Sequence, residues 1–212
     1  MRVLGVIPAR FASTRFPGKP LFPLAGRPMI QWVYEAARRA LPRVVVATDD
    51  RRILSFIQGL GGEAMMTSSR CRSGTDRVAE VSRRRKADIY LNIQGDEPLM
   101  SSRTVRAVLA LHSRRGVCLG TAATALPDRA AWTNPDAVKV LVDNSGNALY
   151  FSRAPIPYYR DGVGAASGGP FRRRDFVLKH LGVYSYAAAT LARFVRWPAG
   201  FFEKAEKLEQ LR

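Results

Sequence analysis

The sequence has few of the residues that hold secreted or membrane proteins together. Only two of its 212 residues are cysteine, Cys71 and Cys118, and their spacing matches no metal site. Because no secretory signal precedes them, we expect reduced thiols and a cytoplasmic protein. No apolar run approaches the roughly 20 residues of a membrane span, so no membrane partner is expected. A chain of this length buries enough surface to fold without disulfide or metal cross-links.

Acidic residues are also scarce. The chain has 17 of them against 34 lysines and arginines, which gives a formal net charge of +17. This excess favours anionic partners without identifying them. A nucleic-acid-binding protein is a remote alternative, suggested by the basic run at 83–86. Because the basic residues are spread along the chain and no aromatic stacking module is present, we expect no specific nucleic-acid partner.

Apolar runs and amphipathic segments alternate in the first half of the chain. We expect strands at 3–7, 44–48, 64–67 and 89–93, and helices at 28–40, 51–60 and 75–86, the last capped by Thr75. This alternation predicts an α/β fold with a mostly parallel sheet and helices on both faces. Functional residues should then follow the carboxyl ends of the strands, at 8–19, 49–50 and 94–98.

The second half is richer in predicted strands. We expect strands at 119–125, 138–142, 148–153 and 176–186, a helix at 187–195, and another helix from 203 to 212. A Gly, Ala and Ser-rich segment at 161–170 is typical of a flexible loop. The chain contains no internal repeat and no sharp domain boundary.

The segment at 8–19 combines two arginines, a lysine, two hydroxyls and a glycine directly after a buried strand. Backbone N–H groups and cationic side chains around a turn are suited to phosphate oxygens. A solvated basic loop is the alternative, since most charge clusters are of that kind. The segment is not a Walker loop, and no dinucleotide-binding glycine motif is present nearby.

Two acidic residues, Asp96 and Glu97, follow the strand predicted at 89–93. A carboxylate that faces a basic loop is well placed to hold Mg²⁺ against a nucleoside triphosphate. The alternative is a structural turn or helix cap before Pro98 and Ser101. The basic loop at 8–19 makes the metal site the preferred interpretation.

A series of segments resembles the 3-deoxy-manno-octulosonate cytidylyltransferases, also called CMP-Kdo synthetases. The segments occur in the family order, at 6–21, 72–77, 92–98, 134–140, 148–157, 180–184 and 208–212. The resemblance implies transfer of CMP from CTP to 3-deoxy-D-manno-octulosonate (Kdo), with release of pyrophosphate, for lipopolysaccharide biosynthesis. It also implies Mg²⁺ as cofactor, a homodimer, and a Rossmann-like nucleotide-diphospho-sugar transferase fold.

The resemblance also assigns domains and site residues. One nucleotidyltransferase domain at 1–212 would bind CTP through about 1–125, and a β-rich part at about 126–212 would serve sugar binding and dimerisation. The triphosphate would contact Arg10, Ser13, Arg15 and Lys19; the cytosine and ribose would lie near Arg72, Ser73 and Gln94; Asp96 would bind magnesium; and Kdo would contact Arg153, His180, Tyr184, Glu209 and Gln210.

The chemistry of the implied reaction suits these residue types. An anionic sugar attacks an anionic phosphate, so Lys19, Arg15 and metal-bound Asp96 would act catalytically by neutralising charge. Arg153 could hold the sugar carboxylate with two parallel hydrogen bonds. Structural roles are the alternatives: a buried core position for His180 or Tyr184, and a structural ion pair for Arg153.

One departure from the family pattern concerns the end of the sequence. Family members continue for a few dozen residues and supply a second carboxylate for magnesium, which no residue here matches. We therefore expect weaker metal binding and low activity from this chain. A cytidylyltransferase for another acidic sugar, such as 8-amino-Kdo or sialic acid, is the nearest alternative, and 153–186 would then set the sugar selectivity.

Overall fold

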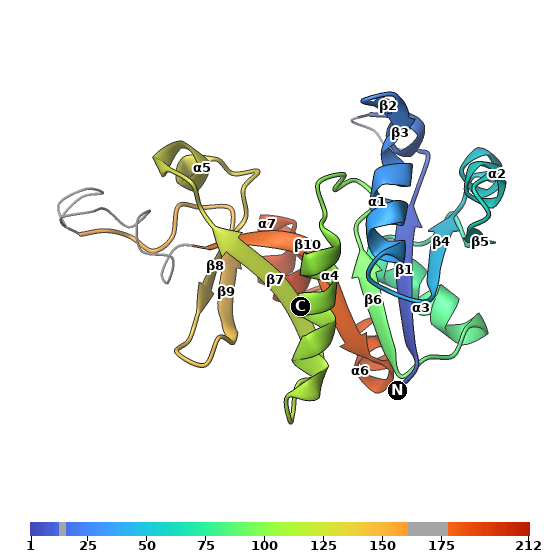
Figure 1. Ribbon diagram of the computed structural model, residues 1–212. Coiled ribbons are helices and arrows are strands. Elements are labelled where there is room, and N and C mark those ends of the chain that lie inside the picture. The colour runs from blue at the N-terminus through green and yellow to red at the C-terminus, as the bar shows by residue number, and fades with distance from the viewer. Residues whose placement is uncertain (13–15, 161–177) are drawn as a thin grey trace. The chain divides into compact units, whose positions relative to one another are not determined.

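The computed structural model describes residues 1–12, 16–160 and 178–212 (Figure 1). The loop expected at 161–170 and the first residues of the strand expected at 176–186 lie outside the described residues. The chain divides into two compact units. Unit 1 comprises Met1–Thr121 and Gly182–Arg196, and unit 2 comprises Ala122–Leu181 and Trp197–Arg212.

A parallel sheet forms the centre of unit 1. Its strands are β1 (Val3–Ala9), β4 (Val44–Thr48), β5 (Glu63–Met66) and β6 (Ile89–Ile93), in the order β5-β4-β1-β6. All residues of β4 and β6 are buried, as expected of strands covered on both faces. The strand β10 (Leu178–Ala187) then pairs antiparallel with β6, from Val183 opposite Ile93 to Ala187 opposite Ile89. The predicted mostly parallel sheet is confirmed for this unit.

Helices cover both faces of this sheet. They are α1 (Met29–Arg38), α2 (Arg51–Gly59), α3 (Gly74–Arg84), α4 (Ser102–Ala110) and α6 (Ala188–Phe194). Helix α1 packs on β1 and β4 and beside α4, whereas α3 packs beside α6 (Figure 1). Short elements also occur: the 3-10 helices η1 (Lys19–Leu21) and η2 (Leu111–Ser113), and the hairpin of β2 (Pro23–Leu24) and β3 (Arg27–Pro28). Within the described ranges, no helix is long and apolar enough to cross a membrane.

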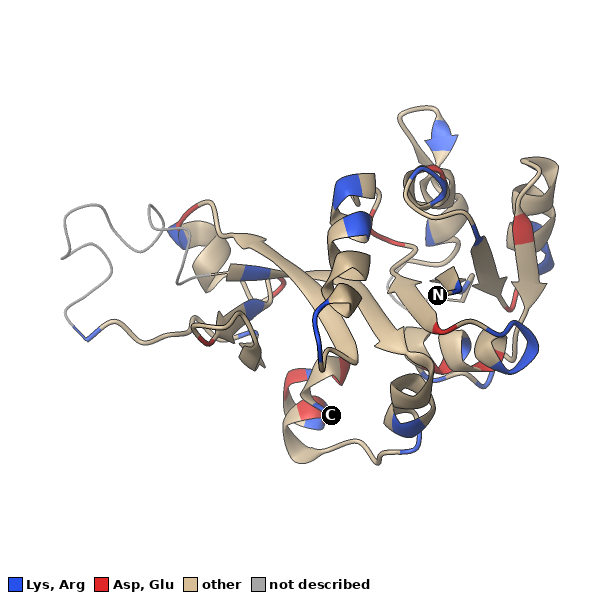
Figure 2. Ribbon diagram, turned by 60° about the horizontal axis from the view of Figure 1, so that its bottom comes forward, with Lys and Arg blue, Asp and Glu red and all other residues tan. Residues whose placement is uncertain are grey.

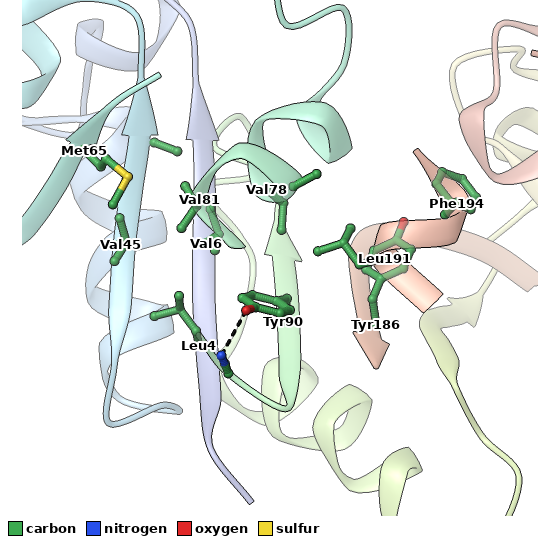
Figure 3. Packing of buried hydrophobic residues seen from close by; sticks show 13 residues of the cluster. Leu4, Val6, Val45, Met65, Val78, Val81, Tyr90, Tyr186, Leu191 and Phe194 are labelled. Atoms are coloured by element: carbon green, nitrogen blue, oxygen red, sulfur yellow. Dashed lines mark hydrogen bonds between the residues drawn. The ribbon is translucent and has the colours of Figure 1, made fainter. Parts of the chain in front are cut away.

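The core beneath α3 and α6 follows from the alternation of side chains along the strands. Leu4 and Val6 of β1 point to the same face and pack against Val78 and Val81 of α3 (Figure 3). The other labelled residues of this cluster are Val45, Met65, Tyr90, Tyr186, Leu191 and Phe194. The Tyr90 hydroxyl is satisfied inside the core, because it accepts a hydrogen bond from the Ala87 N–H at 2.9 Å and donates one to the Arg85 carbonyl at 3.0 Å.

The cap of α3 differs from the prediction. Ser73, not Thr75, begins the helix: its hydroxyl accepts the Asp76 N–H, and the Asp76 carboxylate accepts the Ser73 N–H in return. Thr75 is fully buried, and its hydroxyl accepts a hydrogen bond from the Asn92 side chain at 3.2 Å. The cap of α3 therefore lies two positions before the predicted Thr75. The signal for it in the sequence is Asp76, the acidic residue three positions after Ser73.

Unit 2 is built from antiparallel strands and short helices. The strands β8 (Lys139–Val142) and β9 (Ala148–Ser152) form a hairpin, and the first residues of β10 pair with β8. The Asp143 carboxylate closes the hairpin turn by accepting the N–H groups of Ser145 and Asn147. Strand β7 (Leu119–Ala125) pairs with β10 and leads from unit 1 into unit 2, where the helix α5 (Arg129–Thr133) follows.

The helix predicted at 203–212 is wrong in its extent. The structure has α7 (Phe201–Glu206), then Lys207 in the left-handed conformation with φ of 54°, and the 3-10 helix η3 (Glu209–Leu211). This break allows Leu208 to be buried against Val140 and Phe151. The helix α7 thus ends at Glu206 because the chain must turn to bury Leu208 in the small core of unit 2.

Candidate active site

Three strands of unit 1 end at the same edge of the parallel sheet. The arrowheads of β1, β4 and β6 point in the same direction (Figure 1), and the segments that follow them are those predicted to carry function. Because ligands of such sheets bind outside the carboxyl ends of the strands, this edge is the candidate active site.

Lys19 and Asp96 meet at this edge although 77 positions separate them in the sequence. The Lys19 ammonium lies 2.8 Å from the Asp96 carboxylate. The two side chains retain 33% and 56% of their exposure, so a ligand can reach both of them. The structure therefore brings the basic loop and the acidic strand end together, which is the central geometric expectation from the sequence.

A glycine turn sets the position of Lys19. Gly18 has φ of 74°, in the left-handed region, and its N–H donates to the Phe11 carbonyl at 2.9 Å. A Cβ atom at Gly18 would lie 3.0 Å from the Phe11 ring. The turn leads directly into η1, which begins at Lys19. Arg10 lies exposed just beyond β1, whereas Ser13 and Arg15 lie outside the described residues.

The residues assigned to the cytosine and ribose lie at the ends of β6 and α3. The Gln94 N–H donates to the Gly182 carbonyl at 3.2 Å, and its side-chain amide lies 3.4 Å from the Asn92 oxygen. The Ser73 hydroxyl is used to cap α3, and Arg72 is exposed beside it. All three residues assigned to the nucleoside therefore belong to unit 1, at elements that begin or end at the same edge.

The acidic pair that follows β4 has structural partners. Asp49 accepts a hydrogen bond from the buried Arg77 guanidinium at 2.9 Å, and Arg77 also donates to the Thr67 hydroxyl at 2.6 Å. Asp50 caps α2 and pairs with Arg52, whose hydrogen bond lowers the pKa of the Asp50 carboxyl. Sequence reasoning missed Arg77. The sequence did contain a signal for it. Arg77 lies next to Val78 on the face of α3 that is buried, so a charged side chain occurs where apolar ones are expected.

Glu97 is the second acidic residue of the pair for which the sequence favoured a metal site, and in the structure it has a structural partner. Its carboxylate accepts the Gly182 N–H at 2.9 Å, so it fixes the position of β10 beside the end of β6. A Cβ atom at Gly182 would lie only 2.5 Å from this carboxylate oxygen. A side chain at this position would therefore have to displace the end of the Glu97 side chain.

Arg153 of unit 2 is held by several hydrogen bonds. Its Nε donates to the Glu206 carbonyl at 2.8 Å, and its Nη1 donates to the Pro135 carbonyl at 2.9 Å. Its backbone N–H donates to the Glu206 carboxylate at 2.8 Å. Among the described residues, the partners of the guanidinium are thus carbonyl oxygens rather than carboxylates.

His180 lies in the same unit and is buried against Phe151, with ring centroids 5.2 Å apart. Burial lowers the pKa of His180 to about 4, so the ring is neutral at pH 7. Glu209 and Gln210 belong to η3, and the Glu209 carboxylate lies 3.7 Å from Arg212. Tyr184 belongs to unit 1, where it lies opposite Asn92 on β6 and packs against the core.

The residues available for a metal ion are oxygen donors. Among the residues that the structure describes, no three His, Cys, Asp or Glu side chains are grouped as a metal site. At the sheet edge Asp96 offers a carboxylate that keeps 56% of its exposure. A single carboxylate is compatible with Mg²⁺, which keeps several waters and takes its remaining ligands from substrate phosphates.

Basic charge is not confined to this edge. Lys and Arg residues occur on helices and loops of both units (Figure 2), in line with the net charge of +17. What distinguishes the edge is therefore the juxtaposition of a lysine, a glycine turn and a carboxylate, rather than positive charge alone.

A parallel α/β sheet with a cationic turn and a carboxylate at its edge is suited to binding a nucleotide, and comparison with known proteins places the chain among the nucleotidyltransferases. The chain matches the family model described as cytidylyltransferase over residues 4–212. It is 50% identical to the 3-deoxy-manno-octulosonate cytidylyltransferase of Syntrophobacter fumaroxidans and 46% identical to that of Trichlorobacter lovleyi. The alignments cover all of this chain and 84% and 86% of those proteins. The chain belongs to the cytidylyltransferase family, within its group of 3-deoxy-manno-octulosonate cytidylyltransferases.

A solved structure supports the same assignment. The structure of CMP:2-keto-3-deoxy-manno-octonic acid synthetase complexed with CTP is 42% identical to this chain and superimposes with a TM-score of 0.89. The match covers all of this chain and 84% of that one. The predicted fold class and the family resemblance are both confirmed.

Proposed function

We propose that this protein transfers CMP from CTP to Kdo and releases pyrophosphate. The observation that carries the proposal is the match over the whole chain to a structure of CMP-Kdo synthetase complexed with CTP, and the contact between Lys19 and Asp96 at the edge of the parallel sheet agrees with it. Full-length similarity to proteins named for this reaction supports it. In the reaction, the anomeric hydroxyl oxygen of Kdo bonds to the α-phosphorus, the bond from that phosphorus to the β-phosphate breaks, and the hydroxyl proton passes to solvent.

The first task of the site is to neutralise negative charge. In our proposal Arg10, Ser13, Arg15 and Lys19 contact the triphosphate, and Lys19 and Arg15 stabilise charge on the transferring and leaving groups. Gln94 lies beside the cytosine and ribose, with Arg72 and Ser73 near it. Because positioning and charge neutralisation suffice for phosphoryl transfer, no nucleophilic side chain is needed.

Mg²⁺ is the metal that we propose, with Asp96 as its protein ligand. The ion would supply charge stabilisation at the phosphate oxygens. In the structure Asp96 is paired with Lys19, so Lys19 would have to release this carboxylate oxygen, and turn to the phosphates, for the ion to bind there.

The acidic sugar would contact Arg153, His180, Tyr184, Glu209 and Gln210. A guanidinium suits a carboxylate because its parallel N–H groups match two oxygens. His180 would contribute as a neutral hydrogen-bonding group, since burial lowers its pKa to about 4. In this proposal the nucleotide and the sugar are therefore bound by different side chains.

A pair of substitutions tests the nucleotide site. Lys19→Ala and Asp96→Asn should each lower kcat/KM for pyrophosphate release by roughly 10²-fold or more, because each removes charge stabilisation of the transition state. Lys86→Ala, at an exposed lysine of unit 1, is the matched control and should keep the parental rate. Undiminished transfer by either site variant would refute the proposal. Competition among Kdo, 8-amino-Kdo and sialic acid in the same assay identifies the preferred sugar.

We also propose that the protein is a cytoplasmic homodimer. Cys71 and Cys118 are free thiols, as in a reducing compartment. Unit 2 exposes Leu149 and Phe201 at 66% and 78%, and the Phe201 and Phe202 rings lie 5.5 Å apart. Exposed apolar side chains of this kind are typical of subunit contacts. Sedimentation equilibrium should give the dimer mass, and Phe201→Ser should shift the equilibrium toward monomer.

A further inference from the structure

The hydrogen bonds around Arg153 connect it to two other charged residues, Lys139 and Glu206. Lys139 is 1% exposed, and its ammonium donates to the carbonyls of Arg153 and Asn134 at 2.6 and 2.8 Å. The Glu206 carboxylate accepts the Arg153 N–H at 2.8 Å and the Ser152 hydroxyl at 2.5 Å. Arg153 is therefore held through its backbone N–H by one charged residue and through its carbonyl by another.

The guanidinium itself donates two hydrogen bonds, from two different nitrogens. Nε donates to the Glu206 carbonyl, and one N–H of Nη1 donates to the Pro135 carbonyl. A guanidinium carries five N–H donors, so the others lie at the Nη1 and Nη2 end of the group. Nη2 and the second N–H of Nη1 belong to this set, and neighbouring N–H groups of this kind are what a carboxylate accepts side by side.

The charges in this cluster also influence one another. Burial lowers the pKa of Lys139, and the nearby Arg153 guanidinium lowers it further, whereas the Glu206 carboxylate opposes both effects. Two cations thus share one carboxylate, and that carboxylate is engaged by the Ser152 hydroxyl and a backbone N–H. The cluster keeps an excess of positive charge, which suits an anionic ligand at Arg153.

We infer that Glu206 and Lys139 are positioning residues that orient Arg153 toward the carboxylate of the acidic sugar. They act through Arg153 and touch neither substrate. The inference rests on the proposed function, because it requires a carboxylate-bearing sugar as acceptor. Holding the Arg153 side chain in place favours binding, because a guanidinium that is already fixed loses less side-chain entropy when it binds a carboxylate.

Two substitutions that preserve side-chain size test the inference. Glu206→Gln and Lys139→Met should raise KM for Kdo roughly tenfold and leave KM for CTP within about twofold, since only the sugar contact is misplaced. Lys204→Met is the matched control, because Lys204 is exposed on the same helix as Glu206. If Lys139→Met does not fold, as judged by circular dichroism, Glu206→Gln carries the test.

A second measurement separates positioning from a merely structural role. Titration calorimetry with Kdo and with its carboxamide analogue should show that both variants lose more affinity for the acid than for the amide. Equal losses for the two sugars, a parallel rise of both KM values, or unchanged kinetics in Glu206→Gln would overturn the inference. Failure of the parental protein to bind any carboxylate sugar would instead overturn the proposed function, and this inference with it.

Discussion

His180 provides the sharpest quantitative prediction. Burial lowers its pKa from 6.5 to about 4, because the protonated ring would lose its hydration inside unit 2. This difference between the two pKa values corresponds to about 3 kcal/mol of folding stability. Since the folded pKa is the lower one, this stability is fully present above pH 6.5 and is lost as the pH falls from there toward 4. Between pH 7 and pH 5 the loss should be about 2 kcal/mol.

The chain offers a direct assay, because His112 and His180 are its two histidines. Proton NMR of the ring Cε1–H should show one resonance that does not titrate above pH 5, and a His112→Gln variant assigns it. In urea unfolding, the stability difference between the parental protein and His180→Gln should change by about 2 kcal/mol between pH 7 and pH 5. A His180 resonance that titrates near 6.5 in the folded protein would refute the reasoning.

Three further substitutions test contacts at the sheet edge. Arg77→Met should cost about 3 kcal/mol in urea unfolding, because it leaves the Asp49 carboxylate without its cation. Gly182→Ala should cost roughly 1–3 kcal/mol and lower kcat/KM, because the new methyl group would displace Glu97. Ser73→Ala should cost about 1 kcal/mol through loss of the α3 cap.

Each of these substitutions has a result that contradicts its reasoning. An Arg77→Met protein as stable as the parent would show that the ion pair contributes nothing to the fold. Unchanged stability and activity in Gly182→Ala would mean that β10 moves without cost. A Ser73→Ala protein as stable as the parent would show that the cap contributes nothing to the fold, and Ser73→Thr serves as the matched control, since threonine can also accept the N–H bond.

Local signals in the sequence predicted unit 1 well. The strand prediction at 44–48 and the one at 89–93 agree with β4 and β6 residue for residue, because continuous apolar runs bounded by polar residues define buried strands. The helices α4 and α5 were not predicted. Ser101 caps α4 and Asp128 caps α5, because the side chain of each accepts a free N–H group in the first turn of its helix. These two residues were the signals from which the helices could have been predicted.

Elements whose position depends on distant contacts were predicted less well. The helix predicted at 203–212 is interrupted because Leu208 is buried against β8 and β9. The structural partners of Arg77 and Glu97 were missed for the same reason: Asp49 and Gly182 are 28 and 85 positions away from them. A helix periodicity or a charge pattern carries no information about such partners.

The sequence by itself determined the class of fold, the family resemblance and the residue types needed for a polyphosphate and an acidic sugar. Only the tertiary structure decided which of these residues meet. The parallel sheet places the ends of β1 and β6 side by side, so Lys19 comes within 2.8 Å of Asp96. The physical reason is that hydrogen-bonded strands fix the positions of their ends, whereas the intervening sequence specifies only that each strand forms.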